Sequence, residues 1–263
     1  MNINKPKNMR EYEIWLKNMC GGNGLFLLGR TGYYDVADII KKSFKESDLW
    51  YQLINNLNEY NYEYLKESSG YTLLMYPYEP DLLIKTYDRF LRKTFRKNVL
   101  ENKNWPKEPE SGWILPNNWF SKINDVVRTT IVVKYIDGVE FIKNKIDFLC
   151  TKNNVKYTYS LKAKEEGYYA GHLHVLEQIE IPDPKKSWST TIVDVLIEIK
   201  ITTQIKEVLQ KLIHGHYEKK REESNKKNDM VWQWDYGGPE FSVNYLGHIL
   251  HYIEGVIINV REK

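Results

Sequence analysis

The 263-residue sequence has little cysteine, no long apolar run and no large excess of charge of either sign. Its two cysteines, Cys20 and Cys150, are too few for a disulfide framework and fit a reducing cytosol. No apolar run approaches the roughly 20 residues that a membrane-spanning helix needs, and the start, Met1 to Lys7, lacks the apolar core of a secretory signal. A net charge of +3 does not by itself predict nucleic-acid binding. We therefore expect a soluble, cytoplasmic protein whose ligands are recognised by local features.

The first hundred residues have the apolar spacing of helices. Apolar side chains recur at intervals of three and four over Glu11–Cys20, Asp35–Phe44 and Asp48–Leu65. The strongest helical pattern runs from Asp81 to Leu100, directly after Pro80. Prolines and a glycine between Glu101 and Asn118 predict a loop.

From Ile123 onwards the pattern changes to alternating strands and helices. Strands are predicted over Arg128–Tyr135, Val155–Leu161, His172–Ile181 and Thr190–Ile201, with a hairpin loop at Pro182–Lys185. After the turn Asp137-Gly138, helices are predicted over Val139–Cys150, Thr203–Lys220 and Val243–Val260. This order predicts an α/β or α+β fold, in which helices flank a mixed sheet.

The segment Lys164-Glu-Glu-Gly-Tyr-Tyr-Ala-Gly-His172 places an exposed aromatic at a glycine turn beside a lysine. Tyr168 in that position suits stacking on a nucleobase, because every base has a π-face and every nucleotide carries phosphate. The alternative is an ordinary turn tyrosine in a chain with 20 tyrosines. His172 and His174 lie on one face of the following strand, and we expect them to form hydrogen bonds because no further ligand cluster accompanies them.

Two acidic residues are candidates for metal binding and acid–base chemistry. Period-2 alternation places Glu198 on one strand face with Asp194, Leu196 and Lys200. A carboxylate there is a candidate metal ligand or general base, or else a strand acid paired with Lys200 or Lys162. Asp125 lies at the mouth of the first strand with Arg128 three residues on, a pair that can hold Mg²⁺ and a phosphate together. The alternative is an Asp turn followed by an exposed arginine.

Several cations recur at spacings of three and four in the region predicted as the helix Asp81–Leu100. On one helical face they would repel one another unless an anion neutralised them, and a triphosphate gripped by arginine forks would do so. The alternative is a solvated basic face. The residues concerned are Lys85, Arg89, Arg92, Lys93 and Arg96.

These motifs together resemble RelA/SpoT-type synthetases over roughly Asp81 to Tyr217. That family has a Lys-x-Asn-Gly-Tyr-Arg-Ser-x-His loop, matched here by Lys164, Gly167, Tyr168 and His172, and a Glu-x-Gln-x-Arg-Thr strand, matched by Glu198 and Thr203. The segment Lys85-Thr86 through Lys93 to Arg96-Lys97 resembles the family helix that contacts ATP phosphates. The chain departs from the family at Arg89, Glu166, Tyr169, Lys200 and Thr202, and the Asp125–Arg128 spacing is two residues shorter than the family's.

The resemblance implies a ppGpp-synthetase-like fold, related to nucleotidyltransferases, with a mixed sheet of about five strands. It implies a synthetase core at 81–222 between helical extensions at 1–80 and 223–263. The implied reaction is that of a pyrophosphokinase, which moves the β,γ-diphosphate of ATP onto a ribose 3′-hydroxyl with Mg²⁺. Asp125 and Glu198 would be catalytic and metal-binding. The implied ATP-binding residues are Lys85, Arg89, Lys93, Arg96 and Arg128, and the implied acceptor-binding residues are Tyr168, His172 and Lys164.

Within that family, three features look more like a toxic subgroup found in toxin–antitoxin pairs: the extended helix at Leu82-Leu83-Ile84-Lys85-Thr86, the Asp125 strand entry and the Gly-Tyr-Tyr-Ala-Gly-His loop. That subgroup pyrophosphorylates the 3′-terminal adenosine of tRNA, which blocks aminoacylation, and the resemblance therefore implies an antitoxin protein as partner. A set of lysines would contact the acceptor stem if the fold gathers them: Lys41, Lys42, Lys162, Lys164, Lys185 and Lys186. Two alternatives stay open. One is a small alarmone synthetase that uses GDP or GTP, and the other is an inactive relative that only binds nucleotides or a protein.

Overall fold

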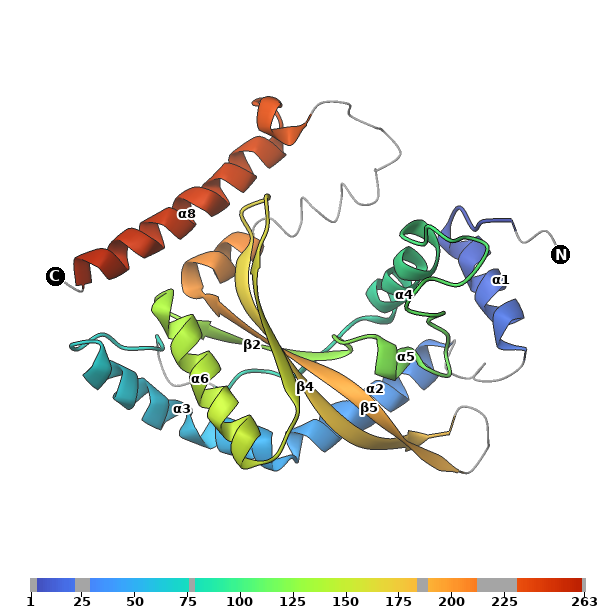
Figure 1. The fold of residues 1–263 in the computed structure, drawn as a ribbon, viewed down its shortest axis with the longest axis horizontal. Helices are drawn as coiled ribbons and strands as arrows, with labels where there is room; N and C mark the ends of the chain where they lie inside the picture. The colour runs from blue at the N-terminus through green and yellow to red at the C-terminus, as the bar shows by residue number, and fades with distance from the viewer. Residues whose placement is uncertain (1–3, 22–28, 76–78, 184–188, 212–230, 262–263) are drawn as a thin grey trace. The chain divides into compact units, whose positions relative to one another are not determined.

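The computed structural model describes residues 4–21, 29–75, 79–183, 189–211 and 231–261 (Figure 1). Three helices come first, α1 (Met9–Cys20), α2 (Arg30–Lys45) and α3 (Asp48–Glu67). They confirm the three predicted N-terminal helices, and the loop predicted at 101–118 contains no helix or strand. Each helix buries an apolar stripe, such as Tyr12 and Leu16 of α1.

The single helix predicted over Asp81–Leu100 is wrong in its first part. Leu83–Ile84 is the short strand β1, the helix α4 spans Tyr87–Phe95, and the π-helix η2 spans Arg96–Leu100. Thr86 lies at the N-cap position of α4 with extended backbone angles, and its side chain makes no capping hydrogen bond. Pairing with a distant strand therefore overrides the helical spacing of Leu82 to Lys85.

The second half contains the remaining strands and helices. After the short helix α5 (Trp119–Lys122) come β2 (Val127–Val133), α6 (Asp137–Lys152), β3 (Tyr157–Ala163), β4 (Tyr169–Pro182) and β5 (Thr190–Thr203). Residues 204–211 are helical, and η3 (Trp232–Trp234) and α8 (Pro239–Arg261) follow. The turn predicted at Asp137-Gly138 is instead the first turn of α6. Parts of the predicted hairpin loop Pro182–Lys185 and of the predicted helix Thr203–Lys220 lie outside the described residues.

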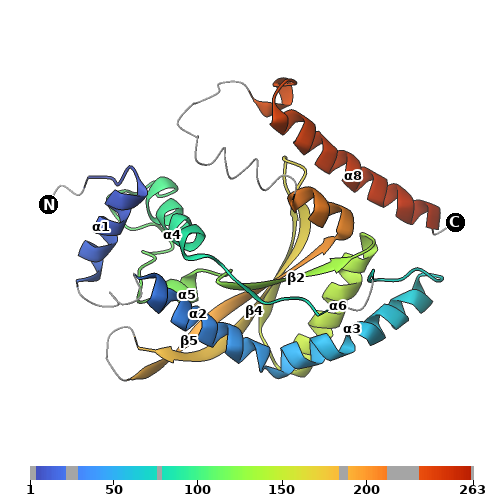
Figure 2. The ribbon, with the colours of Figure 1, turned by 180° about the vertical axis from the view of Figure 1, so that it is seen from behind.

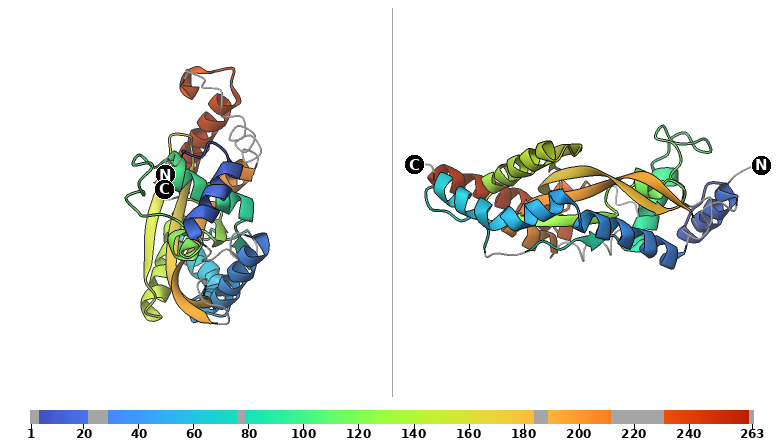
Figure 3. Two further views of the ribbon diagram at one scale, coloured as in Figure 1. Left: turned by 90° about the vertical axis from the view of Figure 1, so that its right-hand side faces the viewer. Right: turned by 90° about the horizontal axis from the view of Figure 1, so that it is seen from below.

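The strands form one mixed five-stranded sheet in the order β1-β2-β5-β4-β3, which confirms the predicted fold class. β1 is antiparallel to β2, with Leu83 opposite Arg128 and Ile84 opposite Val127. The long neighbouring strands β4 and β5 can be followed in Figure 3. Along β5 the side chains alternate, so that Ile197 and Ile199 are buried while Glu198 is half-buried on the opposite face.

The chain divides into two compact units. Unit 1 comprises Met1–Trp50, Leu82–Thr129 and His174–Glu198, and unit 2 comprises Tyr51–Asp81, Thr130–Leu173 and Ile199–Lys263. Figure 2 shows α1, α2 and α4 of unit 1, whose core includes the ring contacts of Tyr12 with Phe95 and of Tyr33 with Phe90. In unit 2, α3 packs on α6 through Tyr64, whose hydroxyl donates to Asp137 at 2.7 Å. Among the described residues, no helix has the length and apolar character needed to cross a membrane.

Candidate functional site

The pairing of β1 with β2 places Lys85 beside the segment that enters β2. The backbone N–H of Lys85 donates to the carbonyl oxygen of Val126 at 2.8 Å. The Tyr33 hydroxyl donates to the Lys85 carbonyl at 2.7 Å. Lys85 therefore precedes α4 instead of lying on its face, and its backbone is fixed from both sides. The prediction that Lys85 shares one helical face with Arg89 and Arg96 is wrong for this reason.

Asp125 is the centre of a largely buried charge cluster in unit 1. Its Oδ2 accepts from Lys85 Nζ at 2.8 Å, and its Oδ1 accepts from Lys93 Nζ at 2.9 Å. The three side chains are 13%, 11% and 16% exposed in the order Asp125, Lys85, Lys93. Hydrogen bonds between charged groups that are largely shielded from water are strong and directional. The two lysines therefore turn inward onto one carboxylate instead of spreading over a basic face.

The pKa values in this cluster are set by burial and by the ion pairs. Burial by itself would raise the pKa of Asp125, but the neighbouring Lys85 and Lys93 outweigh it, so that the pKa is lowered and the carboxylate is ionised at neutral pH. Burial lowers the pKa of Lys85, and its pairing with Asp125 opposes that shift. The cluster carries two positive charges against one negative charge, and this excess would attract an anion such as a phosphate.

Asn124 and His174 lie between this cluster and Glu198. Lys93 Nζ also donates to Asn124 Oδ1 at 3.1 Å, which turns the amide nitrogen of Asn124 towards β4. That nitrogen lies 3.0 Å from His174 Nε2, and the same ring nitrogen lies 3.7 Å from Glu198 Oε1. Because the amide nitrogen can only donate, His174 Nε2 acts as the acceptor. The structure thus brings the two predicted carboxylates close to one another, although the 3.7 Å approach of His174 to Glu198 is not a hydrogen bond. The hydrogen-bonding role expected for His174 is confirmed by its contact with Asn124.

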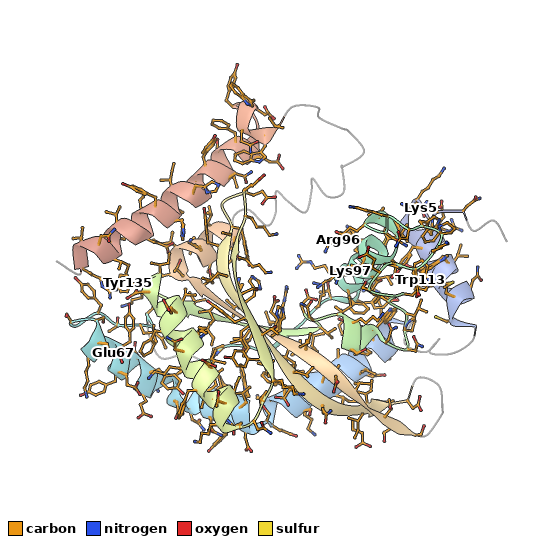
Figure 4. The ribbon with its side chains drawn as sticks, in the orientation of Figure 1. Lys5, Glu67, Arg96, Lys97, Trp113 and Tyr135 are labelled. Carbon is orange, nitrogen blue, oxygen red and sulfur yellow. The ribbon has the colours of Figure 1, made fainter. Side chains whose placement is uncertain are left out.

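The other predicted ATP-binding residues lie around this cluster in unit 1. Arg128 is half-buried on β2 and is close enough to Lys85 to help lower its pKa. Arg89 of α4 is exposed. Arg96, labelled with Lys97 in Figure 4, begins η2, and its Nε lies 3.0 Å from Glu101 Oε1 in an exposed ion pair. Arg89 and Arg96 are therefore positioned at the surface, whereas Lys85, Lys93 and Arg128 are partly enclosed.

The donor groups of unit 1 fit Mg²⁺ in their chemistry. The carboxylates of Asp125 and Glu198 and the amide oxygen of Asn124 are hard oxygen donors, and Mg²⁺ commonly uses one or two protein carboxylates together with water and phosphate. The lowered pKa keeps Asp125 in the anionic form that a metal requires. Within the described part of the chain, no group of three or more His, Cys, Asp or Glu side chains could hold a metal ion.

The predicted acceptor residues lie in unit 2, at the tight turn between β3 and β4. The Gly167 N–H donates to the Lys164 carbonyl and the Lys164 N–H donates to the Tyr168 carbonyl, each at 3.0 Å. Gly167 has a φ of +72°, in the left-handed region that residues with a side chain rarely adopt. Lys164 is exposed, and its Nζ lies 5.5 Å from the centre of the Tyr168 ring. We call residues 164–172 the acceptor loop.

Within the acceptor loop, Tyr168 is fixed by His172. A hydrogen bond of 2.7 Å joins the Tyr168 hydroxyl to His172 Nε2, and the two ring centroids are 6.0 Å apart. The Tyr168 ring is half-buried, so part of it faces solvent. A ring held at its hydroxyl with a cation beside its face is suited to receive a base, because little side-chain freedom remains to be lost on binding.

Sequence reasoning missed Asn124 and Tyr33. Asn124 was not singled out, although it directly precedes Asp125 at the mouth of β2, where a polar side chain commonly faces the same site. Tyr33 belongs to the helical N-terminal region, and no local pattern connects it with Lys85, 52 residues away. Both contacts depend on pairing across the fold.

No family model matches the chain, and no curated protein matches it. Among solved structures, the small alarmone synthetase 2 from Bacillus subtilis is similar at 16% identity with a TM-score of 0.47, over 81% of this chain and 96% of that chain. A GTP pyrophosphokinase family protein from Streptococcus pneumoniae is 13% identical with a TM-score of 0.48, over 84% and 92%. The small alarmone synthetase 1 from Bacillus subtilis, bound to its product pppGpp, is 15% identical with a TM-score of 0.48, over 84% and 96%. At such identities, a reaction for this chain must be argued from its own residues.

Proposed function

We propose that this chain is an ATP-dependent pyrophosphokinase that transfers the β,γ-diphosphate of ATP to a ribose 3′-hydroxyl. The observation that carries the proposal is the largely buried cluster in which Lys85 and Lys93 hold Asp125, with Asn124 and His174 lying between Asp125 and Glu198. An enclosed site with excess positive charge and ionised oxygen donors suits a reaction in which negative charge shifts between phosphate oxygens.

In this reaction the acceptor oxygen forms a bond to the β-phosphorus of ATP, the bond from that phosphorus to the α-phosphate oxygen breaks, and AMP leaves. Glu198 accepts the proton of the acceptor hydroxyl as general base. Lys85, Lys93 and Arg128 bind phosphate oxygens, and the exposed Arg89 and Arg96 contact the nucleotide from the surface. When bound to Asp125 and Glu198, Mg²⁺ would neutralise charge on the transferred group.

We further propose that the acceptor is the 3′-terminal adenosine of tRNA, so that the chain acts as a toxin by blocking aminoacylation. Tyr168 would stack on the terminal base, with Lys164 and His172 beside it. The exposed Lys162 and Lys164 of unit 2 would contact phosphates of the acceptor stem. Lys41 and Lys42, also predicted to contact the stem, belong to unit 1. Lys185 and Lys186, predicted for the same purpose, lie outside the described residues.

A second candidate acceptor is GDP or GTP, which would make the chain a small alarmone synthetase. The glycine turn with Lys164 and Tyr168 favours it as much as it favours tRNA, because stacking on an aromatic ring does not distinguish guanine from adenine. The two candidates differ in the number of phosphates that the acceptor brings to the protein.

The test is incubation with ATP labelled in the β- or γ-phosphate and with magnesium, offering bulk tRNA, GDP or GTP in separate reactions. We expect label in the tRNA 3′ end, with AMP as the second product. Added salt should weaken tRNA use steeply, since many counterions are released, and GTP use much less. Label in GDP or GTP alone would assign the chain to the second candidate. Label in none of them would leave an inactive nucleotide-binding relative and overturn the proposal.

The proposed toxin would be paired with an antitoxin protein, and the catalytic core would span 81–222 between the extensions 1–80 and 223–263. Co-purification of a partner that suppresses label transfer to tRNA would support the first statement. Label transfer by the isolated residues 81–222 would support the second, and its loss on removing 223–263 would argue that the C-terminal helix belongs to the working enzyme.

A further inference from the structure

The acceptor loop of unit 2 packs backbone to backbone on α8. A Cβ added at Gly167 would lie 2.5 Å from the carbonyl oxygen of Asn244, and a Cβ added at Gly247 would lie 2.6 Å from the carbonyl oxygen of Gly167. Real Cβ atoms do not approach oxygen so closely. The turn and the helix therefore touch at a point where only glycine fits on either side.

His248 of α8 forms hydrogen bonds with two residues of the same loop. Its Nε2 donates to the carbonyl oxygen of Glu165 at 2.8 Å, and its Nδ1 accepts from the Tyr169 hydroxyl at 2.7 Å. Because a carbonyl can only accept, the first contact fixes which ring nitrogen carries the proton. One helical side chain thus holds both the start of the turn and the strand that follows it.

Beside His248, the ring of Tyr169 stacks on the ring of His251, with centroids 3.7 Å apart and planes inclined by 11°. Lys206, from the helical residues 204–211, places its Nζ 4.1 Å from the Tyr169 ring centre and 2.5 Å from His251 Nδ1. The same ammonium lies 3.2 Å from Glu254 Oε2, and the two side chains are 6% and 3% exposed. Stacking, cation–π attraction and a buried ion pair therefore combine on one face of α8.

The C-terminal end of α8 is anchored as well. Arg261 donates to the Tyr64 hydroxyl and to Asp137 Oδ2, each at 3.0 Å, and its guanidinium lies over the rings of Tyr71 and Tyr135. Tyr135 is labelled in Figure 4. Because α3 and α6 supply Tyr64 and Asp137, the helix that holds the acceptor loop is itself fixed to the body of unit 2.

We infer that α8 positions the acceptor loop, with Gly247 and His248 as positioning residues for acceptor binding; this inference rests on the proposed function. Tyr168 lies between Gly167 and Tyr169, and α8 holds both of these neighbours. Loosening α8 therefore lets the Tyr168 ring move and weakens acceptor binding. ATP binding is unaffected, because the phosphate-binding cluster belongs to unit 1.

The test compares two identical substitutions in the same helix. Gly247→Ala introduces a methyl group against the turn, whereas Gly255→Ala introduces it where nothing lies within 4 Å. Gly255→Ala should leave the loop and the kinetics unchanged. Gly247→Ala should raise the acceptor KM about tenfold or more, since small displacements of a positioning group have large kinetic effects, with the ATP Kd within about twofold of wild type. The loop amides of Lys164 and Gly167 should exchange hydrogen faster in Gly247→Ala than in Gly255→Ala.

Tyr169→Phe is the second variant, in case Gly247→Ala does not fold. It removes only the hydroxyl that meets His248 and keeps the ring stacked on His251, so a smaller change in the same direction is expected. Unchanged exchange at the loop in both variants would overturn the role of α8, whatever reaction the chain performs. Faster exchange with an unchanged acceptor KM would separate the contact from acceptor binding and also overturn the inference. Absence of label transfer by the wild-type chain would instead refute the proposed function.

Discussion

In unit 1 the candidate residues are joined by charge: two lysines share one carboxylate, and an amide and an imidazole lie between it and a second carboxylate. In unit 2 the candidate residues are joined by shape: a glycine turn lies against a glycine of α8, and a tyrosine lies flat on a histidine. A change of charge without a change of shape should therefore disable the first group. A change of shape without a change of charge should disable the second.

The largest expected effect is that of Glu198→Gln. This variant keeps the shape of the side chain but cannot accept a proton, so transfer should fall by roughly 10²- to 10⁴-fold, the usual contribution of a general base. Asp194→Asn is the matched control, because Asp194 lies on the same face of β5 and is exposed. The rate of acceptor turnover at saturating ATP is measured for both variants. Near-normal transfer by Glu198→Gln would remove Glu198 from the mechanism.

Asp125→Asn should be the most destabilising of the charge changes. It leaves the buried ammonium groups of Lys85 and Lys93 without their anion, and breaking a buried ion pair in this way typically costs about 3–5 kcal/mol in the free energy of unfolding. Asp88→Asn is the control, because its partner Arg30 and Asp88 itself are 60% and 58% exposed, and exposed pairs contribute about 0–1 kcal/mol. Urea titration measures the loss in the free energy of unfolding for both variants. Equal losses of stability would show that the Asp125 cluster is not enclosed in solution.

Tyr168→Ala tests whether the aromatic ring in the acceptor loop of unit 2 stacks on the acceptor base. Acceptor binding should weaken by about 1–3 kcal/mol, the usual contribution of one stack between a base and an aromatic side chain, while ATP binding changes little. Tyr168→Phe keeps the ring and loses the hydrogen bond to His172, so it should retain most of the affinity. The two Kd values for tRNA and for GTP, measured separately, provide the readout. An acceptor affinity untouched by Tyr168→Ala would refute the stacking role.

The smallest expected effect is a pH dependence carried by His251. Burial, and then the neighbouring Lys206 and His248, lower the pKa of His251 from 6.5 to about 4. Between these values the unfolded chain binds more protons, so this contribution to stability is complete above about pH 6.5 and is lost as the pH falls towards 4. With the ring 34% exposed, the loss at pH 5 should be about 1 kcal/mol after allowance for solvent screening.

His251→Phe keeps the aromatic stack with Tyr169 but cannot titrate. The difference in the free energy of unfolding between pH 7 and pH 5 should therefore be smaller in this variant than in the wild-type chain. Lys206, Glu254 and Tyr169 contact the same ring, and His248 lies close enough to influence its pKa. All four residues are present in both chains. Identical differences in the two proteins would show that His251 is as accessible to protons as in the unfolded chain.

Several features of the fold followed from local pattern alone. Helical spacing predicted α1, α2, α3 and α8 to within a few residues, since an amphipathic stripe is a property of the segment itself. Strand alternation placed Glu198 on the less buried face of β5, and the glycine in the acceptor loop predicted its turn. The types of chemistry were also visible in the sequence, because lysines, two acids and a tyrosine beside a glycine limit what a site can bind.

The tertiary structure alone decided which of these residues meet. Helical spacing around Lys85 was overridden because β1, only two residues long, pairs with β2 some 40 residues later, and such pairing leaves no local pattern. The pairing moved Lys85 out of the helix and onto Asp125. Gly247 likewise has no signal in the sequence, since the need for glycine comes from Gly167, 80 residues away. Composition and periodicity determined which elements form and which groups are available, whereas long-range contacts determined which groups become a site, because only packing brings distant residues within the few ångströms at which charges and rings interact.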